Sequence, residues 1–181
     1  METIETERLS LRRLEAADAL AVLCIAGDED TAWWADIVPL EDIDDSKYFI
    51  RWGNNRDGFE QYGITLRGEN RVIGLVQVTS WTLGGRTECV MGYMLSDRER
   101  GRGYMTEAVR AVCGDLFGRR GVSAVTCEIL PDNGGSRGVV SRCGFRVEDE
   151  YPFGRPSRNL DDRPLDEWVL TDTMWNSRAA A

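Results

Sequence analysis

A short turn rich in glycine and arginine is the stretch of this sequence best suited to holding a phosphate group. Residues 96–105 read Ser-Asp-Arg-Glu-Arg-Gly-Arg-Gly-Tyr-Met and follow a strand-like apolar run at 90–95. They lead into a run whose apolar residues recur at helical spacing: Met105, Val109, Val112 and Leu116. The first N–H groups of a helix have no partner within it, and the helix dipole adds about half a positive charge there. Gly101 and Gly103 have no side chains and would let a phosphate approach these groups. A plain connecting turn fits the same residues, because a short Gly-x-Gly is a weak signal.

Glu128 is the one charged residue in the apolar run 125–130. A strand that follows a crossover helix is normally covered on both faces, so this carboxylate is predicted to be buried. Burial without a partner would increase its proton affinity and make Glu128 a competent general base near neutral pH. A salt bridge to an arginine, or a strand end open to solvent, explains the residue without chemistry.

Two small polar residues, Asn133 and Ser136, follow this strand. They lie at the carboxyl end of a predicted parallel strand, where the ligands of open α/β sheets collect. Two parallel neighbours that diverge at this end would open a slot between them. The same side chains are also typical caps for the helix that follows.

An acidic segment, residues 28–45, contains eight acidic residues, no basic residue and the pair Trp33 and Trp34. Such a run is typical of a solvated loop or helix face. The tryptophans would also suit one wall of an acceptor pocket for a cationic group, because an aromatic ring attracts a cation to its face.

The pattern along the chain predicts an α+β fold with a mixed, mostly antiparallel central sheet flanked by helices. Helices are expected at 16–26, 46–52, 104–117 and 133–143, and strands at 8–14, 59–66, 72–81, 87–95, 122–130, 145–151 and 164–170. Short turns make the strands at 59–66, 72–81 and 87–95 antiparallel neighbours. A crossover helix separates 87–95 from 122–130, so these two strands should form one parallel, splayed pair. No linker or repeat divides the chain, which predicts a single domain over residues 1–181.

The composition limits the chemistry. The net charge is −9, with one lysine (Lys47) and no histidine. A negative field disfavours nucleic acid as a partner and favours amines, although solubility alone also explains the charge. A basic patch of Arg98, Arg100 and Arg102 that binds RNA is disfavoured on the same ground. A metal would need carboxylates or thiols alone, and no suitable spacing occurs, so no metal is expected. Proton transfer near neutral pH should fall to a carboxylate.

The sequence also predicts a cytoplasmic protein without a membrane segment. No apolar run approaches the roughly 20 residues of a membrane-spanning helix, and residues 1–5 lack the features of a signal peptide. The five cysteines show no Cys-x-x-Cys pair, which is typical of reduced, mostly buried thiols.

Together these motifs resemble the GNAT superfamily of acyl-CoA-dependent N-acyltransferases, and within it the branch of the ribosomal-protein alanine N-acetyltransferases. The resemblance spans almost the whole chain, from 6–12 (Thr-Glu-Arg-Leu-Ser-Leu-Arg) through 72–74 (Val-Ile-Gly) and 92–95 (Gly-Tyr-Met-Leu). It is strongest at 100–108 (Arg-Gly-Arg-Gly-Tyr-Met-Thr-Glu-Ala) and at Asn133-x-x-Ser136 with Gly144-Phe145. The combination at this spacing is highly specific, whereas any single piece is not.

The resemblance implies a binding site for acetyl-CoA as cosubstrate. The family's signature, Gln/Arg-x-x-Gly-x-Gly/Ala, falls on Arg100, Gly103 and Met105, with methionine in place of the small last residue. The backbone amides implied to hold the pyrophosphate are those of Gly101, Arg102, Gly103, Tyr104, Met105 and Thr106. The pantetheine arm is implied to pair with Tyr93, Met94 and Leu95, to meet Asn133, and to present the thioester carbonyl to the N–H near Leu95.

The reaction implied is direct transfer of an acetyl group to a primary amine in a ternary complex. Glu128, five residues before Asn133, falls where related enzymes place the carboxylate that deprotonates the amine, directly or through water. Val140 stands in place of the tyrosine that many relatives use as general acid. Ser136 or a water is therefore expected to protonate the CoA thiolate.

The acceptor amine is the open half of this hypothesis. The resemblance favours the N-terminal alanine or serine of a protein, and the acidic segment favours a small cationic amine such as a polyamine or aminoglycoside. An open groove would favour the former and a closed acidic pocket the latter. A module that binds CoA without turnover is the alternative outside enzymes. A homodimer is the first oligomer to test, because dimers are the commonest soluble oligomers.

Overall fold

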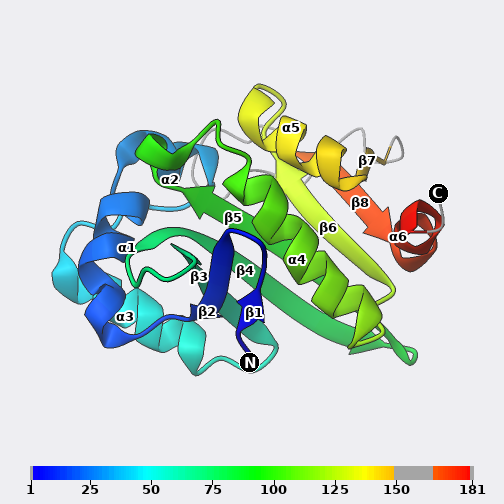
Figure 1. Ribbon diagram of the computed structural model, residues 1–181, viewed down its shortest axis with the longest axis horizontal. Coiled ribbons are helices and arrows are strands. Elements are labelled where there is room, and N and C mark those ends of the chain that lie inside the picture. The colour runs from blue at the N-terminus through cyan, green and yellow to red at the C-terminus, as the bar shows by residue number, and fades with distance from the viewer. Residues whose placement is uncertain (1, 149–164, 180–181) are drawn as a thin grey trace.

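The computed structural model describes residues 2–148 and 165–179, which form an eight-stranded mixed sheet with helices packed on it (Figure 1). The strands are β1 (Ile4–Glu5), β2 (Leu9–Arg13), β3 (Phe59–Leu66), β4 (Val72–Leu83), β5 (Arg86–Leu95), β6 (Ala124–Ile129), β7 (Arg146–Val147) and β8 (Asp166–Thr171). The helices are α1 (Ala19–Ala26), α2 (Glu29–Trp34), α3 (Ile43–Asn54), α4 (Tyr104–Gly118), α5 (Gly134–Cys143) and α6 (Asp172–Ala179), with 3-10 turns η1 (Ala16–Asp18) and η2 (Asp97–Glu99).

The sheet has the strand order β1-β2-β3-β4-β5-β6-β8-β7. β5 and β6 run parallel, and each of the other neighbouring pairs is antiparallel. The predicted fold class, the antiparallel β3–β4–β5 succession and the parallel pair are therefore confirmed. The parallel pair follows from the crossover through α4, which carries the chain back to the same end of the sheet.

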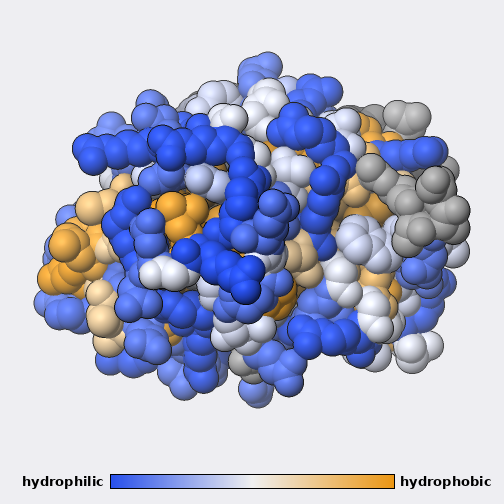
Figure 2. Space-filling model, viewed as in Figure 1, coloured by the Kyte–Doolittle hydropathy of each residue, from blue (hydrophilic) through white to orange (hydrophobic). Residues whose placement is uncertain are grey.

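α4 covers one face of this sheet because its apolar residues recur at helical spacing. Val109, Val112 and Leu116 are buried and belong to one core cluster with Met91 of β5 and Val125 of β6. Each such buried side chain stabilises the fold by about 1.5–3 kcal/mol. The surface seen from this side is mostly hydrophilic, so the outward faces of the helices carry polar residues over this core (Figure 2).

α1 and α3 cover the opposite face at the other end of the sheet. Val22 and Ile25 of α1 and Ile50 of α3 form a second core cluster with strand residues that include Leu75 and Met94. This cluster fixes the position of the segment between the two helices, which contains α2.

The acidic segment 28–45 is largely solvated, as expected, and its acidic residues also begin two helices. The carboxylate of Asp28 accepts from the N–H of Thr31 at 2.8 Å and begins α2. The carboxylate of Asp42 accepts from the N–H groups of Asp44 and Asp45 at 2.8 and 2.9 Å, so α3 begins at Ile43 instead of the predicted residue 46. Part of the acidic charge is thus explained by helix capping.

The remaining differences lie near the ends of the chain. The sequence pattern gave no expectation of β1, α2 or α6. β7 and β8 form the predicted closing pair, but residues 149–151 and 164 of the two predicted strands lie outside the described residues. Within residues 2–148 and 165–179, no helix has the length and apolar character needed to cross a membrane.

Candidate functional site

The turn between β5 and α4 has the backbone shape that the sequence predicts. Gly101 and Gly103 have φ angles of 76° and 78°, which place both in the left-handed region that favours glycine. Gly103 is also the N-cap of α4, and no side chain in the described residues caps the helix there. The first N–H groups of α4 therefore face outward beside two residues that have no side chains. This arrangement suits a phosphate group.

The parallel strands β5 and β6 diverge beside this turn, as expected. Their pairing ends at Val90 opposite Thr126, whereas β5 continues to Leu95 and β6 to Ile129. Among residues 2–148 and 165–179, the side of β5 that faces β6 thus has no strand partner over residues 91–95. Peptide groups exposed in this way can pair with an extended ligand.

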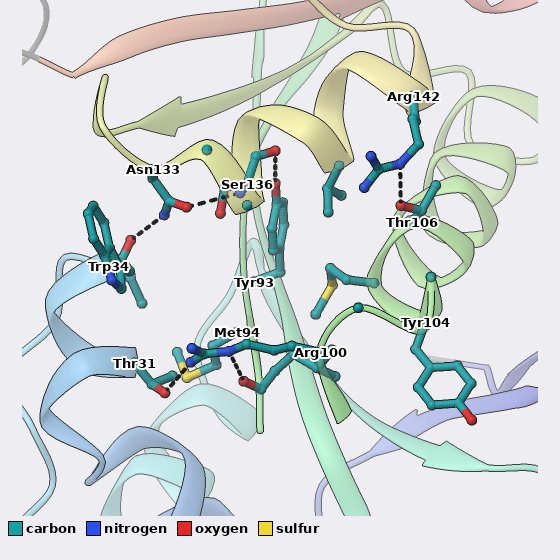
Figure 3. Close-up of a pocket in the computed structure, with 18 of the residues that line it drawn as sticks. Thr31, Trp34, Tyr93, Met94, Arg100, Tyr104, Thr106, Asn133, Ser136 and Arg142 are labelled. Atoms are coloured by element: carbon teal, nitrogen blue, oxygen red, sulfur yellow. Dashed lines mark hydrogen bonds between the residues drawn. The ribbon is translucent and has the colours of Figure 1, made fainter. Parts of the chain in front are cut away.

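The turn and the end of β5 beyond its pairing with β6 border one cavity of about 740 Å³ (Figure 3). Most of the predicted cofactor residues line it: Tyr93, Met94, Leu95, Arg100, Gly101, Gly103, Tyr104, Met105, Thr106 and Asn133. Ser136, predicted as general acid, and Trp34, predicted as an acceptor wall, line the same cavity. Residues of α2, β5, the turn, α4 and the start of α5 therefore meet at one place.

Arg102 is the predicted cofactor residue that is absent from the lining of this cavity. Its guanidinium lies 3.3 Å from the buried carboxylate of Glu99, and its backbone carbonyl accepts from Arg8 at 3.0 Å. Glu99 also binds Arg71 at 2.9 Å. The side chain of Arg102 thus braces the turn, which leaves its backbone amide as the group able to meet a ligand.

Arg100 connects the turn to α2. Its Nη2 donates to the hydroxyl of Thr31 at 2.7 Å, and its Nε donates to the carbonyl of Leu95 at 3.4 Å (Figure 3). The Thr31 hydroxyl in turn donates to Asp28 at 2.6 Å. Hydrogen bonds from the Thr31 side chain and backbone, assisted by the charge of Arg100, lower the pKa of Asp28. α2 is thereby held against the cavity, with Thr31, Trp34 and Ala35 on its wall.

Asn133 and Ser136 meet at the first turn of α5. The Asn133 side-chain oxygen caps the N–H of Ser136 at 3.0 Å, and its Nδ2 donates to the carbonyl of Trp34 at 3.4 Å. The hydroxyl of Tyr93 donates to the Ser136 carbonyl at 3.1 Å. Burial raises the pKa of Tyr93 well above its ordinary value, so this phenol stays protonated at neutral pH. The capping alternative is correct for Asn133, and the same residue also borders the cavity.

Glu128 is less buried than the sequence predicts. It is half-buried on β6 and is not part of the lining of the cavity, although β6 forms one edge of the slot. Its neighbours Cys127 and Ile129 point into the core under α4, so Glu128 projects from the other face of the sheet. Among the described residues, α1 and α3 pack on another part of this face, around Leu75 and Met94, so the expectation that Glu128 is fully buried is not met.

Trp33 and Trp34 take different roles. Both are about two-thirds covered, but Trp34 lines the cavity and Trp33 does not. The two tryptophans therefore do not form one wall of this cavity together, and a role for Trp34 toward an acceptor stays a prediction.

Seven of the lining residues were not predicted from the sequence: Thr31, Ala35, Asp132, Gly134, Gly135, Val139 and Arg142. Arg142 brings a second guanidinium to the cavity, where its Nε donates to the Thr106 hydroxyl at 3.3 Å. Arg142 lies outside the motifs that carry the family resemblance. The packing of α5 against α4 brings it to the first turn of α4.

Neither metal nor thiol chemistry is indicated by the described residues. In residues 2–148 and 165–179, no three His, Cys, Asp or Glu side chains are placed to hold a metal ion. Burial raises the pKa of Cys89 to about 11 and raises that of Cys113 and Cys127 as well. These thiols remain protonated at neutral pH and are poor nucleophiles.

Comparison with known proteins places this geometry among acetyltransferases. The family model described as an acetyltransferase (GNAT) domain matches residues 8–146. The uncharacterized N-acetyltransferase p20 of Bacillus licheniformis is 26% identical over 160 residues, which cover 82% of this chain and 84% of that protein. The ribosomal protein uS5-alanine N-acetyltransferase of Escherichia coli is 24% identical over 87 residues, 48% of this chain and 45% of that protein.

The fold is also found among solved structures. The crystal structure of spermidine N-acetyltransferase from Vibrio cholerae in complex with CoA and spermine matches with a TM-score of 0.79. The match covers 94% of this chain and 99% of that protein, at 14% sequence identity. At this identity the likeness concerns the fold.

Proposed function

We propose that this chain, which belongs to the GNAT acetyltransferase family, moves an acetyl group from acetyl-CoA to the N-terminal amine of a protein whose first residue is alanine or serine. Membership of the family rests on the domain match over residues 8–146, and it makes the chain an N-acetyltransferase. The acceptor and the roles of individual residues are the proposed part.

One observation carries the proposal: the glycine turn and the end of β5 beyond its pairing with β6 line the same cavity. Pyrophosphate would lie on the backbone amides of residues 101–106, at the positive end of α4. The pantetheine arm would extend along the free side of β5, past Asn133. Both parts fit because Gly101 and Gly103 leave the backbone open and β6 has already turned away.

The proposed chemistry uses groups on the two sides of the slot. Glu128 accepts a proton from the acceptor ammonium, directly or through water, and the neutral amine attacks the thioester carbonyl carbon. A backbone N–H near Leu95 stabilises the negative charge on the carbonyl oxygen. The carbon–sulfur bond then breaks, and Ser136 or a water gives the thiolate its proton. The new amide and free CoA are the products.

The positions of these two groups support this division of work. Ser136 lies on α5, on the α4 side of the sheet, and Glu128 projects from the opposite face. An amine that approaches beside Glu128 and a thiolate that leaves toward Ser136 would use opposite sides of one slot. Such an arrangement needs no covalent acyl-enzyme, which agrees with the protonated state of the buried thiols.

A small cationic amine is the second candidate acceptor. Trp34 on the cavity wall favours it, because an aromatic face attracts a cation. The related fold that was solved with CoA and spermine gives this candidate a concrete form. The acidic segment adds less support than the sequence promised, since several of its carboxylates cap helices.

An assay of CoA thiol release tests the proposal. The panel contains peptides that begin with alanine or serine, spermidine and an aminoglycoside, each mixed with acetyl-CoA and the protein. We expect release that depends on the amine and is fastest with a peptide. Binding of acetyl-CoA in calorimetry without release for any amine would contradict the proposal and leave the module that binds CoA without turnover.

A further inference from the structure

Two stretches that carry the family resemblance meet in the structure, although the proposed function uses only one of them. Residues 6–12 span the turn before β2 and most of that strand, and residues 100–108 contain the glycine turn and the start of α4. β1 and β2 lie beside α4 (Figure 1). The contact is made by Thr6 and Arg8 from the first stretch and by Glu107 from the second.

Glu107 accepts hydrogen bonds on both of its carboxylate oxygens. Its Oε1 accepts from the hydroxyl of Thr6 at 2.6 Å and from the backbone N–H of Arg8 at 2.9 Å. Its Oε2 accepts from the Arg8 Nε at 2.6 Å and lies 2.6 Å from the Arg8 Nη2. Against the opposing effect of burial, the hydrogen bonds from Thr6 and Arg8 lower the pKa of Glu107. The group is therefore a carboxylate at neutral pH.

A carboxylate at this place has two opposite effects. Glu107 lies in the first turn of α4, where the helix dipole favours a negative charge. The same end of the helix is the proposed pyrophosphate site, and a further negative charge there repels an anionic ligand. The guanidinium of Arg8 balances this charge at hydrogen-bond distance. With Arg8 in place, the first turn of α4 keeps its carboxylate without a net negative charge from the pair.

Arg8 also contacts the glycine turn itself. Its Nη1 donates to the carbonyl of Arg102 at 3.0 Å. Its Cζ lies 4.9 Å from the centre of the Tyr104 ring, which is within the range of a cation–π contact. A Cβ built on Gly103 would lie 3.5 Å from the Arg8 Nη2. The guanidinium therefore lies against Gly103 and contacts the residues on both sides of it.

The bond to the Arg102 carbonyl sets the direction of one N–H group. A trans peptide is planar, so the carbonyl of Arg102 and the N–H of Gly103 point in opposite directions. Because Arg8 holds the carbonyl, the N–H points away from the guanidinium. Gly103 lines the cavity and Arg8 does not, so this direction is the cavity side of the turn. No backbone carbonyl of the described residues accepts from this N–H, which leaves it available to a ligand.

A simple ion pair between β2 and α4 would not need an arginine. Arg8 uses three nitrogen atoms in one plane: Nε and Nη2 toward Glu107, and Nη1 toward the Arg102 carbonyl. A lysine offers one nitrogen on a flexible stem and cannot reproduce this fork. Lysine at position 8 would thus keep the charge and lose the hold on the turn.

We propose that Arg8 and Glu107 are positioning residues for the pyrophosphate of acetyl-CoA: Glu107 fixes the guanidinium of Arg8, and Arg8 turns the N–H of Gly103 toward the ligand. The inference rests on the proposed binding of acetyl-CoA at the glycine turn. Neither side chain lines the cavity, and neither takes part in proton transfer.

The test uses Arg8→Lys, Glu107→Gln and the double variant, with calorimetry of CoA binding as the main measurement. Arg120→Lys is the matched control, because Arg120 also binds a carboxylate through two nitrogens, that of Glu60 at 2.6 and 2.8 Å, and does not line the cavity. Steady-state kinetics then compare two donors with the same acceptor amine. Acetyl-CoA carries the pyrophosphate, whereas S-acetylpantetheine ends before it.

We expect each single variant to raise the Kd of CoA and the KM of acetyl-CoA about tenfold, the loss typical of one hydrogen bond to a charged group. The kcat should stay within about twofold of the parent, and kcat/KM for S-acetylpantetheine should not change. The double variant should lose little more than one single variant, because the two residues act on the same peptide group. Thermal midpoints should be similar to that of Arg120→Lys.

Glu107→Gln also gives a test by the sign of its effect. Charge alone predicts tighter CoA binding, because the variant removes a negative charge near the phosphates. Positioning predicts weaker binding, since glutamine no longer holds the guanidinium as an ion pair.

The inference would be overturned by CoA binding to both single variants that equals or exceeds that of Arg120→Lys. An equal loss of kcat/KM with both donors would overturn it too, since a general disturbance of the fold does not depend on pyrophosphate. A parent protein that binds no CoA would contradict the proposed function and this inference with it. CoA binding that ignores Arg8 and Glu107 would contradict the inference alone.

Discussion

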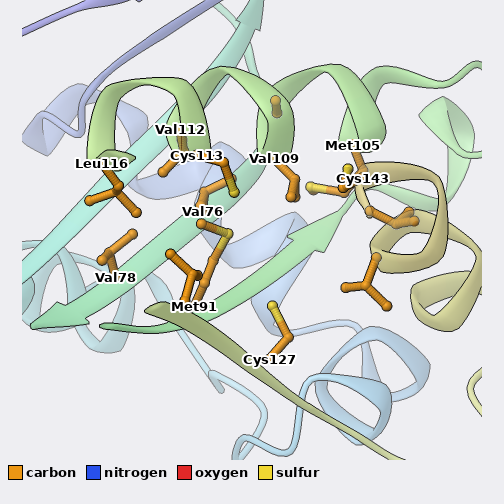
Figure 4. Packing of buried hydrophobic residues seen from close by; sticks show 14 of the residues in the cluster. Val76, Val78, Met91, Met105, Val109, Val112, Cys113, Leu116, Cys127 and Cys143 are labelled. Atoms are coloured by element: carbon orange, nitrogen blue, oxygen red, sulfur yellow. The ribbon is translucent and has the colours of Figure 1, made fainter. Parts of the chain in front are cut away.

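The two faces of the central sheet are built from the same strands but have different surroundings. α4 packs on one, the covered face, whereas the described helices do not pack on the other beside β5 and β6, the open face. On the covered face, Met91 and Cys127 lie under the apolar side of α4 (Figure 4), and together with Val125 they are almost fully buried. On the open face, Val90, Thr126 and Glu128 keep contact with solvent although each is one residue away in sequence. Successive residues of a strand point to opposite faces, so a single step separates these two environments.

This difference shows how the fold keeps its stability apart from its chemistry. Burial on the covered face stabilises the sheet, so the open face can carry groups that would be costly inside a core. The slot between β5 and β6 lies where the two faces meet. Changes on the covered face should therefore affect unfolding, and changes on the open face should affect catalysis.

Glu128→Gln should have the largest effect and should act on catalysis alone. Loss of a general base lowers turnover by about 100-fold or more, so kcat at pH 7 should fall by at least that factor. The deficit should shrink at pH 9, where more of the amine is already neutral. Steady-state kinetics from pH 6 to 9 would measure this, with Glu69→Gln in an exposed turn as control.

Glu128 is half-buried, and glutamine keeps its shape and one acceptor oxygen, so the same variant should leave the free energy of unfolding within about 1 kcal/mol of the parent. Equal turnover of variant and parent across the pH range would remove Glu128 from the mechanism.

Leu116→Ala should give the opposite pattern. Leu116 of α4 packs against the covered face and is 2% exposed. Removal of a buried leucine typically costs about 3 kcal/mol of unfolding free energy. Urea denaturation would measure the loss, and Leu20→Ala, at a side chain that is 65% exposed, is the matched control with an expected change below about 0.5 kcal/mol. A large change in the Kd of acetyl-CoA for the folded variant would show that the two faces are not separate.

Gly103→Val should act on both properties, because the turn serves both the backbone and the ligand. A valine at a φ of 78° costs about 1–2 kcal/mol of stability. It also puts a side chain where pyrophosphate would lie, so we expect the Kd of acetyl-CoA in calorimetry to rise at least 30-fold.

Gly68→Val separates these two effects. Gly68 has a φ of 83° in the turn between β3 and β4 and is not part of the cavity lining, so its valine variant should lose similar stability without any change in affinity. Similar affinities for the Gly103 and Gly68 variants would rule out the proposed phosphate site.

The smallest expected effect concerns pH and an ionic group at the rim of the covered face. Arg120 binds Glu60 at 2.6 and 2.8 Å, and these hydrogen bonds lower the pKa of Glu60 against the opposing effect of burial. The carboxylate therefore stabilises the fold above its unfolded pKa, and this contribution disappears as the pH falls through the lower folded pKa.

Unfolding free energies between pH 5 and 3 should thus fall less steeply for Glu60→Gln than for the parent. The difference should stay below about 1 kcal/mol because the pair is partly exposed to solvent. Parallel slopes for the two proteins would show that this ion pair does not contribute.

Much of the fold could be predicted because local patterns and packing agree. β3 has its predicted bounds, and β5 and α4 differ from theirs by one residue, since apolar residues repeat clearly at strand or helix spacing there. α2 could not be predicted because its acidic residues and paired tryptophans give no such repeat. It is held by distant partners instead, through the bonds of Arg100 to Thr31 and of Asn133 to the Trp34 carbonyl.

The candidate site shows the same limit. The turn and slot follow from glycine positions and a crossover, which are local features. Arg100 and Arg102 look alike in sequence, yet the first borders the cavity and the second turns to Glu99, a choice set by the fold around Glu99. The partial exposure of Glu128 could not be predicted from the sequence either, because it depends on which part of the sheet face opposite α4 is covered by α1 and α3.

A crystal structure of the protein with acetyl-CoA would test the central claim most directly. The account predicts pyrophosphate density on the amides of residues 101–106, the pantetheine arm between β5 and β6, and the thioester between Ser136 and Glu128. Acetyl-CoA bound at another place, or a slot that stays closed at saturating ligand, would contradict it.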